Sequence, residues 1–282
     1  MRRFAILLGI FVLLAGSCFV QAGTLAQFRT RLGDIEVELY DEDKPVTVQN
    51  FIHYVQSGAY QDEFAHRLVP GFVLQGGGFT ITNRGTTNWS VVAIPTFPPI
   101  TNEFAVGRRF SNAYGTIAMA KLGGDTNSAT SQWYFNLTNN AFLDKADTNN
   151  LFVVFGHVIS GTNVLNTFKR FKYYTGTQTS NLVYQGYAPP FDTLPMFRPK
   201  VTDTNLVFID ISLLEIAVQN LAGGGHRISW NSPAGMTNIV EFTTNFPAIW
   251  NTLVRTNGTG ARISVNDSDA SADRFYRVRI AF

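Results

Sequence analysis

The chain has 282 residues, 45% hydrophobic and 15% charged, which suits one large domain or two unequal ones and excludes a largely disordered chain. Its formal net charge is +2, and without Arg2 and Arg3 twenty basic residues face twenty acidic ones. A chain this close to neutral lacks the basic stripe that nucleic-acid binding requires, so we expect no nucleic-acid partner.

The first 22 residues have the pattern of an export signal. Arg2 and Arg3 form a short positive segment, residues 4–16 are apolar, and Val20-Gln21-Ala22 is an A-x-A-like cleavage site. The apolar run is short for a membrane span of about 20 residues, which favours cleavage over anchoring. An alternative is lipidation of Cys18, because residues 15–18 loosely resemble a lipoprotein box.

Alternating apolar residues predict a strand pair over 25–40 that turns near Gly33. Pro45 is placed to begin a helix that ends at Gly58. Residues 80–100 are polar and contain prolines, which indicates a long surface loop, and residues 172–203 show no clear period. The other predicted elements are strands over 66–69, 72–74, 116–120, 133–137, 151–159 and 206–216, and a helix over 164–171.

A glycine-rich stretch marks a change in composition near the C-terminal end. Residues 221–225 read LAGGG, and about five short strands follow. These strands predict a small β-sandwich of the fibronectin-III type. The predicted organisation is a signal peptide over 1–22, a main domain over 23–216, a linker over 217–225 and a small β domain over 226–282.

Several sequence motifs occur in a fixed order between residues 47 and 165. Residues 64–78 read FAHRLVPGFVLQGGG, and residues 115–136 read GTIAMAKLGGDTNSATSQWYFN. Residues 47–60 read TVQNFIHYVQSGAY, residues 102–104 read NEF, and residues 141–165 read AFLDKADTNNLFVVFGHVISGTNVL. Together these motifs resemble those of the cyclophilin family of peptidyl-prolyl cis/trans isomerases, in a bacterial form, over about residues 25–216.

This resemblance implies a mainly β fold, an eight-stranded antiparallel barrel capped by two helices, whose interior is filled by apolar side chains. An active site would then lie on the outside of the barrel. The implied reaction is rotation about the bond that precedes proline, whose barrier of about 18–20 kcal/mol comes from amide resonance. A cation that donates a hydrogen bond to the proline nitrogen stabilises the twisted state more than the planar one.

The resemblance also assigns roles to ten residues. Arg67 would be the hydrogen-bond donor to the proline nitrogen, and Gln75 would hold both the substrate backbone and Arg67. Ala120 would bind the peptide through its backbone, with Gln132 beside it. The residues that would line the proline pocket or its edge are Phe72, Val73, Tyr134, Phe142, Leu143 and Phe152. For Val73 and Leu143, packing in the hydrophobic core is an equally good interpretation.

Five positions depart from the family's usual residues, and one of them is Lys121, which replaces a common asparagine. Val73 takes the place of a frequent methionine, and Tyr134 adds a hydroxyl that needs a partner or water. Phe142 stands where tryptophan is familiar, which predicts weak cyclosporin binding. Phe152 stands where the family has a histidine at the groove edge.

The remaining expectations concern partners and location. None of the four histidines pairs at metal-ligand spacing, so we expect neither a metal nor another cofactor. The expected partners are proline-containing polypeptides, bound by a monomer exported across the inner membrane to a periplasmic or secreted location. The small β domain is a candidate for envelope or carbohydrate contact by fold analogy alone. The alternative function is a proline-peptide binding or scaffolding module with little turnover.

Overall fold

The computed structural model describes residues 24–145, 151–214, 216–232, 236–245, 249–269 and 273–281. The predicted signal peptide and Cys18 lie outside the described residues. Within the described ranges the chain is mainly β with two α-helices, as predicted. None of the helices in these ranges is both long enough and apolar enough to cross a membrane.

Eight strands form the principal antiparallel sheet. They are β1 (Leu25–Thr30), β2 (Gly33–Leu39), β3 (Arg67–Val69), β4 (Val73–Gly76), β7 (Thr116–Met119), β8 (Trp133–Asn136), β9 (Val154–Ser160) and β13 (Asp210–Leu214). Their spatial order is β13–β1–β2–β9–β7–β8–β4–β3. The sheet curls so that its two ends meet: Ala65 donates a backbone hydrogen bond to Val207 (2.9 Å), and Ile209 donates one to Glu63 (3.1 Å).

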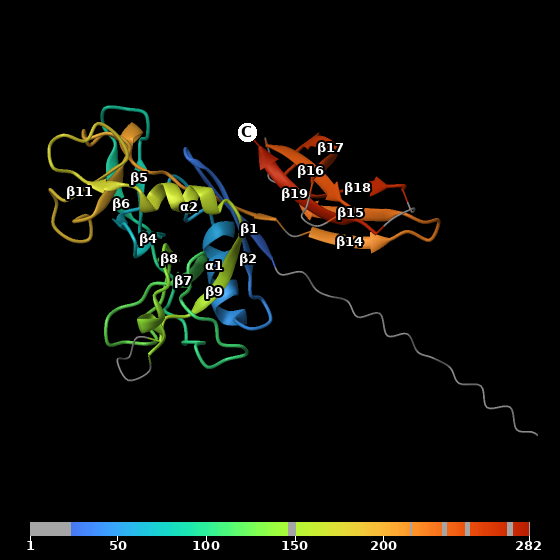
Figure 1. The fold of residues 1–282 in the computed structure, drawn as a ribbon, viewed down its shortest axis with the longest axis horizontal. Coiled ribbons are helices and arrows are strands. Elements are labelled where there is room, and N and C mark those ends of the chain that lie inside the picture. The colour runs from blue at the N-terminus through green and yellow to red at the C-terminus, as the bar shows by residue number, and fades with distance from the viewer. Residues whose placement is uncertain are drawn as a thin grey trace, which may run out of the picture.

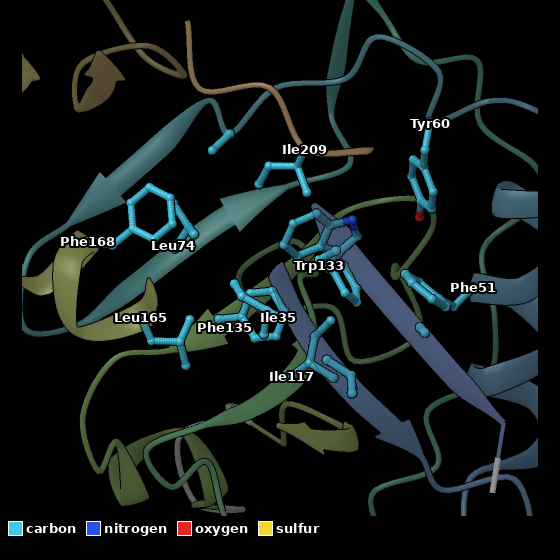
Figure 2. Close-up of a cluster of buried hydrophobic side chains, with 14 of the residues drawn as sticks. Ile35, Phe51, Tyr60, Leu74, Ile117, Trp133, Phe135, Leu165, Phe168 and Ile209 are labelled. Carbon is cyan, nitrogen blue, oxygen red and sulfur yellow. The ribbon is translucent and has the colours of Figure 1, made fainter. Parts of the chain in front are cut away.

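The concave side of this curled sheet is filled by apolar side chains. The alternation of β2 is confirmed, because Ile35, Val37 and Leu39 are buried while their neighbours are partly exposed. Phe28 packs edge-on against Trp133 and Phe135, with ring centroids 5.0 Å apart in both pairs. Figure 2 shows Trp133 and Phe135 pointing toward side chains from other strands in this core.

The two helices pack on the principal sheet and contribute to the same core. Helix α1 (Pro45–Gln56) begins at the proline that the sequence indicated, and it buries Val48, Phe51 and Ile52. Its first turn is bound by a distant carboxylate, because the backbone nitrogens of Val46 and Thr47 donate to Glu103 at 3.0 and 2.7 Å. Helix α2 (Thr162–Lys169) begins two residues before the predicted start.

The prediction of a surface loop over 80–100 was wrong, because this region contains a hairpin of β5 (Phe79–Thr82) and β6 (Ser90–Ala93). Every residue of β6 is exposed, so burial imposes no alternation on its sequence. Residues 172–203 also contain a small sheet, formed by β10 (Lys172–Tyr173), β11 (Leu182–Tyr184) and β12 (Leu194–Met196). Its side chains join Phe64 and Ile81 in a second apolar cluster.

The C-terminal region contains two further sheets, and its five predicted strands are confirmed. These five strands are β15 (His226–Asn231), β16 (Thr237–Thr243), β17 (Asn251–Asn257), β18 (Arg262–Asp267) and β19 (Phe275–Ala281), and a sixth strand, β14 (Ile216–Asn220), precedes them. The sheets have the orders β14–β15–β18 and β17–β16–β19, and side chains from both form one apolar cluster around Trp230. Much of the predicted linker is structured: residues 217–220 belong to β14, and Leu221 to Gly225 form the turn into β15.

The C-terminal sheets lie beside β1 and β2 of the principal sheet, as Figure 1 shows in orange to red. Leu213 and Leu214, neighbours on β13, pack into different clusters: Leu213 against the main core, and Leu214 in the cluster around Trp230. An ion pair between Glu36 and Arg279 (3.7 Å) adds a polar contact at the same junction. One strand therefore links the two hydrophobic clusters.

Candidate functional site

The register of four strands places the predicted site on the outer face of the principal sheet. Arg67 on β3 lies opposite Gln75 on β4, and Gln75 lies opposite Tyr134 on β8. Tyr134 in turn lies opposite Ala118 on β7. Residues directly opposite in antiparallel strands share a face, so these four side chains point to one side. The alternate residues, such as Leu74 and Phe135, point into the main core.

Two glutamines and an arginine form the polar part of this face. The side-chain amide of Gln75 donates to the side-chain oxygen of Gln132 at 2.7 Å. Gln132 is held through its backbone, because its carbonyl accepts a hydrogen bond from the nitrogen of Ala120 at 2.8 Å. The Cζ atom of Arg67 lies 5.7 Å from the centroid of the Phe72 ring, a cation–π geometry.

The apolar part is a cluster separate from the main core. Val73, Tyr134 and Leu143 are buried in it, together with Ala118 and Val154. Phe72, Ala120 and Phe152 are half-buried at its margin. Val73 and Leu143 are therefore buried outside the main core, and their role in lining a proline pocket stays a prediction.

Phe142 has a different environment from the other apolar candidates. It lies in a 3-10 helix (Ala141–Asp144) and is 49% exposed. Its ring stacks on Phe72 with centroids 5.6 Å apart. Phe142 therefore extends the apolar surface outward from Phe72 toward solvent.

The hydroxyl of Tyr134 has a buried partner that the sequence did not reveal. It donates to the side-chain oxygen of Asn112 at 2.7 Å, and Asn112 donates in turn to Asp144 at 2.7 Å. Burial, together with the charge of Asp144, raises the pKa of Tyr134 well above its ordinary value. The phenol therefore stays neutral, and this chain of hydrogen bonds fixes the orientation of its ring.

Two titratable side chains lie behind the site. His66 is 1% exposed, and burial with the nearby charge of Arg67 lowers its pKa to about 4. It is therefore a neutral, buried histidine. Glu63 is fully buried and accepts a hydrogen bond from the nitrogen of Gly77 (2.6 Å) at the corner after β4, and burial raises its pKa well above its ordinary value.

The structure brings all ten predicted site residues together through these contacts. The sequence analysis missed Asn112, Asp144 and Glu63 as supporting residues. Asp144 belongs to a motif that we had quoted, but Asn112 and Glu63 carry no motif and are found only through their contacts. A pocket of about 500 Å³ elsewhere in the molecule holds none of the ten, and its lining has as many aspartates as arginines.

Comparisons with known proteins give the same result as the motifs. The sequence profile described as "Cyclophilin type peptidyl-prolyl cis-trans isomerase/CLD" matches residues 25–184. The chain is 38% identical over 166 residues to the peptidyl-prolyl cis-trans isomerase of Acinetobacter baylyi, covering 59% of this chain and 81% of the relative. It is 42% identical over 135 residues to peptidyl-prolyl cis-trans isomerase A of Dickeya dadantii, covering 48% and 65% of the two chains.

A crystal structure of a Cryptosporidium parvum cyclophilin type peptidyl-prolyl cis-trans isomerase, determined in the presence of the dipeptide Ala-Pro, aligns with a TM-score of 0.43 and 20% identity. The alignment covers 67% of this chain and 98% of that one. The family profile spans more than half of this chain, and the Acinetobacter relative is covered over most of its length. The chain thus belongs to the cyclophilin-type peptidyl-prolyl cis-trans isomerase family.

Proposed function

We propose that this chain accelerates cis/trans isomerisation of X-Pro bonds, with Arg67 acting on the proline nitrogen. The observation that carries this proposal is the pairing of Arg67 with Gln75 beside the cluster of Phe72, Val73, Tyr134 and Leu143. The cluster offers an apolar surface to the proline ring, and the polar pair faces the imide. This reaction needs no nucleophile and no group that changes its protonation state.

Arg67 would lower the barrier by differential binding. In the planar imide the nitrogen lone pair is delocalised, whereas in the twisted state it is localised and accepts a hydrogen bond. A guanidinium is always charged and donates in a fixed plane, so it favours the twisted state over both planar ground states. Every 1.36 kcal/mol or so of this preference accelerates rotation about tenfold.

Gln75 and Gln132 would position both partners. The hydrogen bond between their side chains restricts Gln75, which lies across from Arg67 on the neighbouring strand. Gln75 would then bind the substrate backbone, while the backbone of Ala120 binds the peptide beside it. The Phe72 ring limits the movement of Arg67 through their cation–π contact.

The test is NMR exchange between the cis and trans forms of a blocked Ala-Pro peptide, with wild-type protein and the Arg67→Ala variant. We expect a clear acceleration that falls about 100-fold or more in the variant, while affinity for the peptide changes much less. Arg31→Ala is the matched control, because Arg31 also lies over a ring, that of Phe197 at 5.2 Å, away from the site. Folded wild-type protein that binds the peptide without accelerating exchange would contradict the proposal and favour the binding-module alternative.

We also propose that the chain is an exported bacterial protein with a separate small β domain at its C-terminus. The support for export is the pattern of residues 1–22, and the support for a second domain is the apolar cluster around Trp230. Mass spectrometry of the mature protein distinguishes cleavage after Ala22 from lipidation of Cys18. A protein that keeps residues 1–22 would contradict export by cleavage.

A further inference from the structure

A small apolar pocket lies where the β5–β6 hairpin meets the segment of residues 172–203, and we call it the aromatic pocket. Its volume is about 230 Å³, below the roughly 300–1,000 Å³ of typical small-molecule sites, so it suits one or two side chains of a bound peptide. Four of its eight described lining residues are aliphatic, and the other four are Phe64, Trp89, Tyr187 and Phe191. The hairpin and β11 lie together at one end of the molecule (Figure 1).

Two rings of the aromatic pocket reach solvent, and each carries a hydrogen-bond donor. Tyr187 is 45% exposed, and Trp89 is half-buried. Within the described ranges, neither the indole N–H of Trp89 nor the hydroxyl of Tyr187 makes a hydrogen bond. None of the eight lining residues is charged. The pocket therefore offers a bound chain flat apolar rings and two donors, but no charge.

The aromatic pocket lies beside the strand that carries Arg67. The backbone nitrogen of Leu68 donates to the carbonyl of Thr193 at 2.8 Å, and Thr193 directly precedes Leu194, which lines the pocket. Two Cα steps of about 3.8 Å and one backbone hydrogen bond place the Cα atoms of Arg67 and Leu194 within about 14 Å of each other. A polyproline chain rises about 3.1 Å per residue, so about four or five residues cover this distance.

Packed side chains also connect the aromatic pocket with the polar part of the site. The ring of Phe79 lies 4.7 Å from that of Phe191 in the pocket and 5.1 Å from the imidazole of His66. His66 forms a hydrogen bond with Gln132, the side chain that binds Gln75. The pocket is thus continuous with the candidate proline site, and one polypeptide can contact both.

We propose that the aromatic pocket binds a second proline of the polypeptide whose first proline is held beside Arg67. This inference rests on the proposed isomerase function and specifies proline-rich polypeptides as its substrate class. Proline has no backbone N–H, and a polyproline helix leaves its carbonyl groups free of internal hydrogen bonds. Aromatic-lined grooves bind such segments at a low cost in entropy, because the helix is already formed. The proline rings stack on Trp89 and Tyr187, whose N–H and hydroxyl donate to the carbonyl groups.

The experiment uses blocked peptides that contain an Ala-Pro unit, a flexible spacer of glycine and serine, and a Pro-Pro pair, in both orders along the chain. Matched peptides have Ala-Ala in place of Pro-Pro. With a spacer of about four residues, wild-type protein should bind the Pro-Pro peptide about tenfold more tightly in at least one order, because the second contact becomes intramolecular. Without a spacer this gain should vanish, since the chain cannot reach the pocket. The indole N–H resonance of Trp89 should shift only when the gain is present.

Trp89→Ala and Tyr187→Ala should each lose the gain in affinity from Pro-Pro, yet should isomerise the Ala-Ala peptide as fast as the wild type. Tyr173→Ala is the matched control, because Tyr173 is a 38% exposed tyrosine of β10 in the same small sheet but does not line the pocket. Equal dissociation constants of the two peptides for the wild type, or a gain that survives in both pocket variants, overturns the proposal. If no peptide is isomerised, the isomerase function fails, but the dissociation constants and the Trp89 resonance still decide whether the pocket binds proline.

Discussion

His66 lies one residue before Arg67, and its imidazole is buried. The ring makes an edge contact with Phe79 at 5.1 Å and a hydrogen bond with the Gln132 side chain. Burial is the largest cause of its low pKa, and the charge of Arg67 adds to it. This histidine therefore belongs to the support of the site and is expected to remain neutral during the reaction.

His66 should make the protein less stable in acid. Its pKa is about 4 in the folded chain against 6.5 for an ordinary histidine, so the unfolded chain binds more protons between these values. The stabilisation is present above pH 6.5 and is lost as the pH falls toward 4. Urea unfolding should show a loss of about 2 kcal/mol between pH 7 and pH 4.5 that His66→Gln does not show.

The same substitution at the exposed His53 of α1 is the control for the loss of an imidazole at the protein surface. If the free energy of unfolding changes with pH in the same way in the wild type and in His66→Gln, His66 is not responsible for the acid sensitivity. The comparison between variants matters, because carboxyl groups also titrate in this range.

Prediction from sequence worked best for side chains that belong to regular strands. Arg67, Gln75 and Tyr134 share a face because side chains alternate along a strand. A motif that lies on a strand therefore also predicts which of its side chains share a face. Asn112 could not be found in this way. It reaches Tyr134 from an irregular segment, and only the tertiary fold brings the two together. A buried amide in such a segment leaves no periodic signal in the sequence.

At the scale of elements, the corner between β4 and β5 joins the site to the core. Gly77 has a φ of +73°, and an added Cβ would lie 2.4 Å from the backbone oxygen of Ser131. Its nitrogen also donates to the buried Glu63. Gln75 precedes this corner and Ser131 precedes Gln132. The close approach of Gly77 to Ser131 therefore positions both glutamines.

Replacing Gly77 with alanine should destabilise the protein by roughly 3 kcal/mol or more, because backbone strain and a backbone clash add together. Gly58→Ala is the matched control: φ is +75°, but an added Cβ would meet nothing within 4 Å. That variant should cost only about 1 kcal/mol. Chemical unfolding measures the stability of both variants. Equal losses of stability would show that the clash at Ser131 is relieved by a small shift.

The elements that sequence analysis missed share a physical cause. The hairpin of β5 and β6 contains one exposed strand, and β10, β11 and β12 have only two or three residues each. A strand with no buried face, or with fewer than four residues, has no room for an alternating pattern. By contrast, β2 and β8 place side chains in the main core, and the ends of both strands were predicted almost to the residue.

For the whole molecule, β13 is the element shared by the two hydrophobic clusters. Leu213 faces the main core, while its neighbour Leu214 is 2% exposed in the cluster around Trp230. Leu25, opposite Leu214 on β1, also packs against that second cluster. The backbone of β13 thus lies between the two clusters.

We expect calorimetry to show one unfolding transition for the full chain, since loss of either cluster exposes one side of β13. Leu214→Ala should lower the stability of this single transition by about 2–5 kcal/mol. Leu213→Ala is the matched comparison on the other side of the strand and should shift the same transition by a smaller amount, because Leu213 is half-buried. Two separate transitions, each sensitive to only one of these leucines, would show that the parts unfold independently.

The alternation along β4 constrains how this site changes in evolution. Val73 and Gln75 face the site while Leu74, between them, faces the core. Inserting or deleting one residue here would exchange the two sets, so that a glutamine enters the core and a leucine meets the substrate. Point substitutions can alter the site gradually, but a change of length within β4 cannot. Length differences among relatives should therefore concentrate in segments such as the β5–β6 hairpin. The strands of this hairpin do not have the main core on one face and the site on the other.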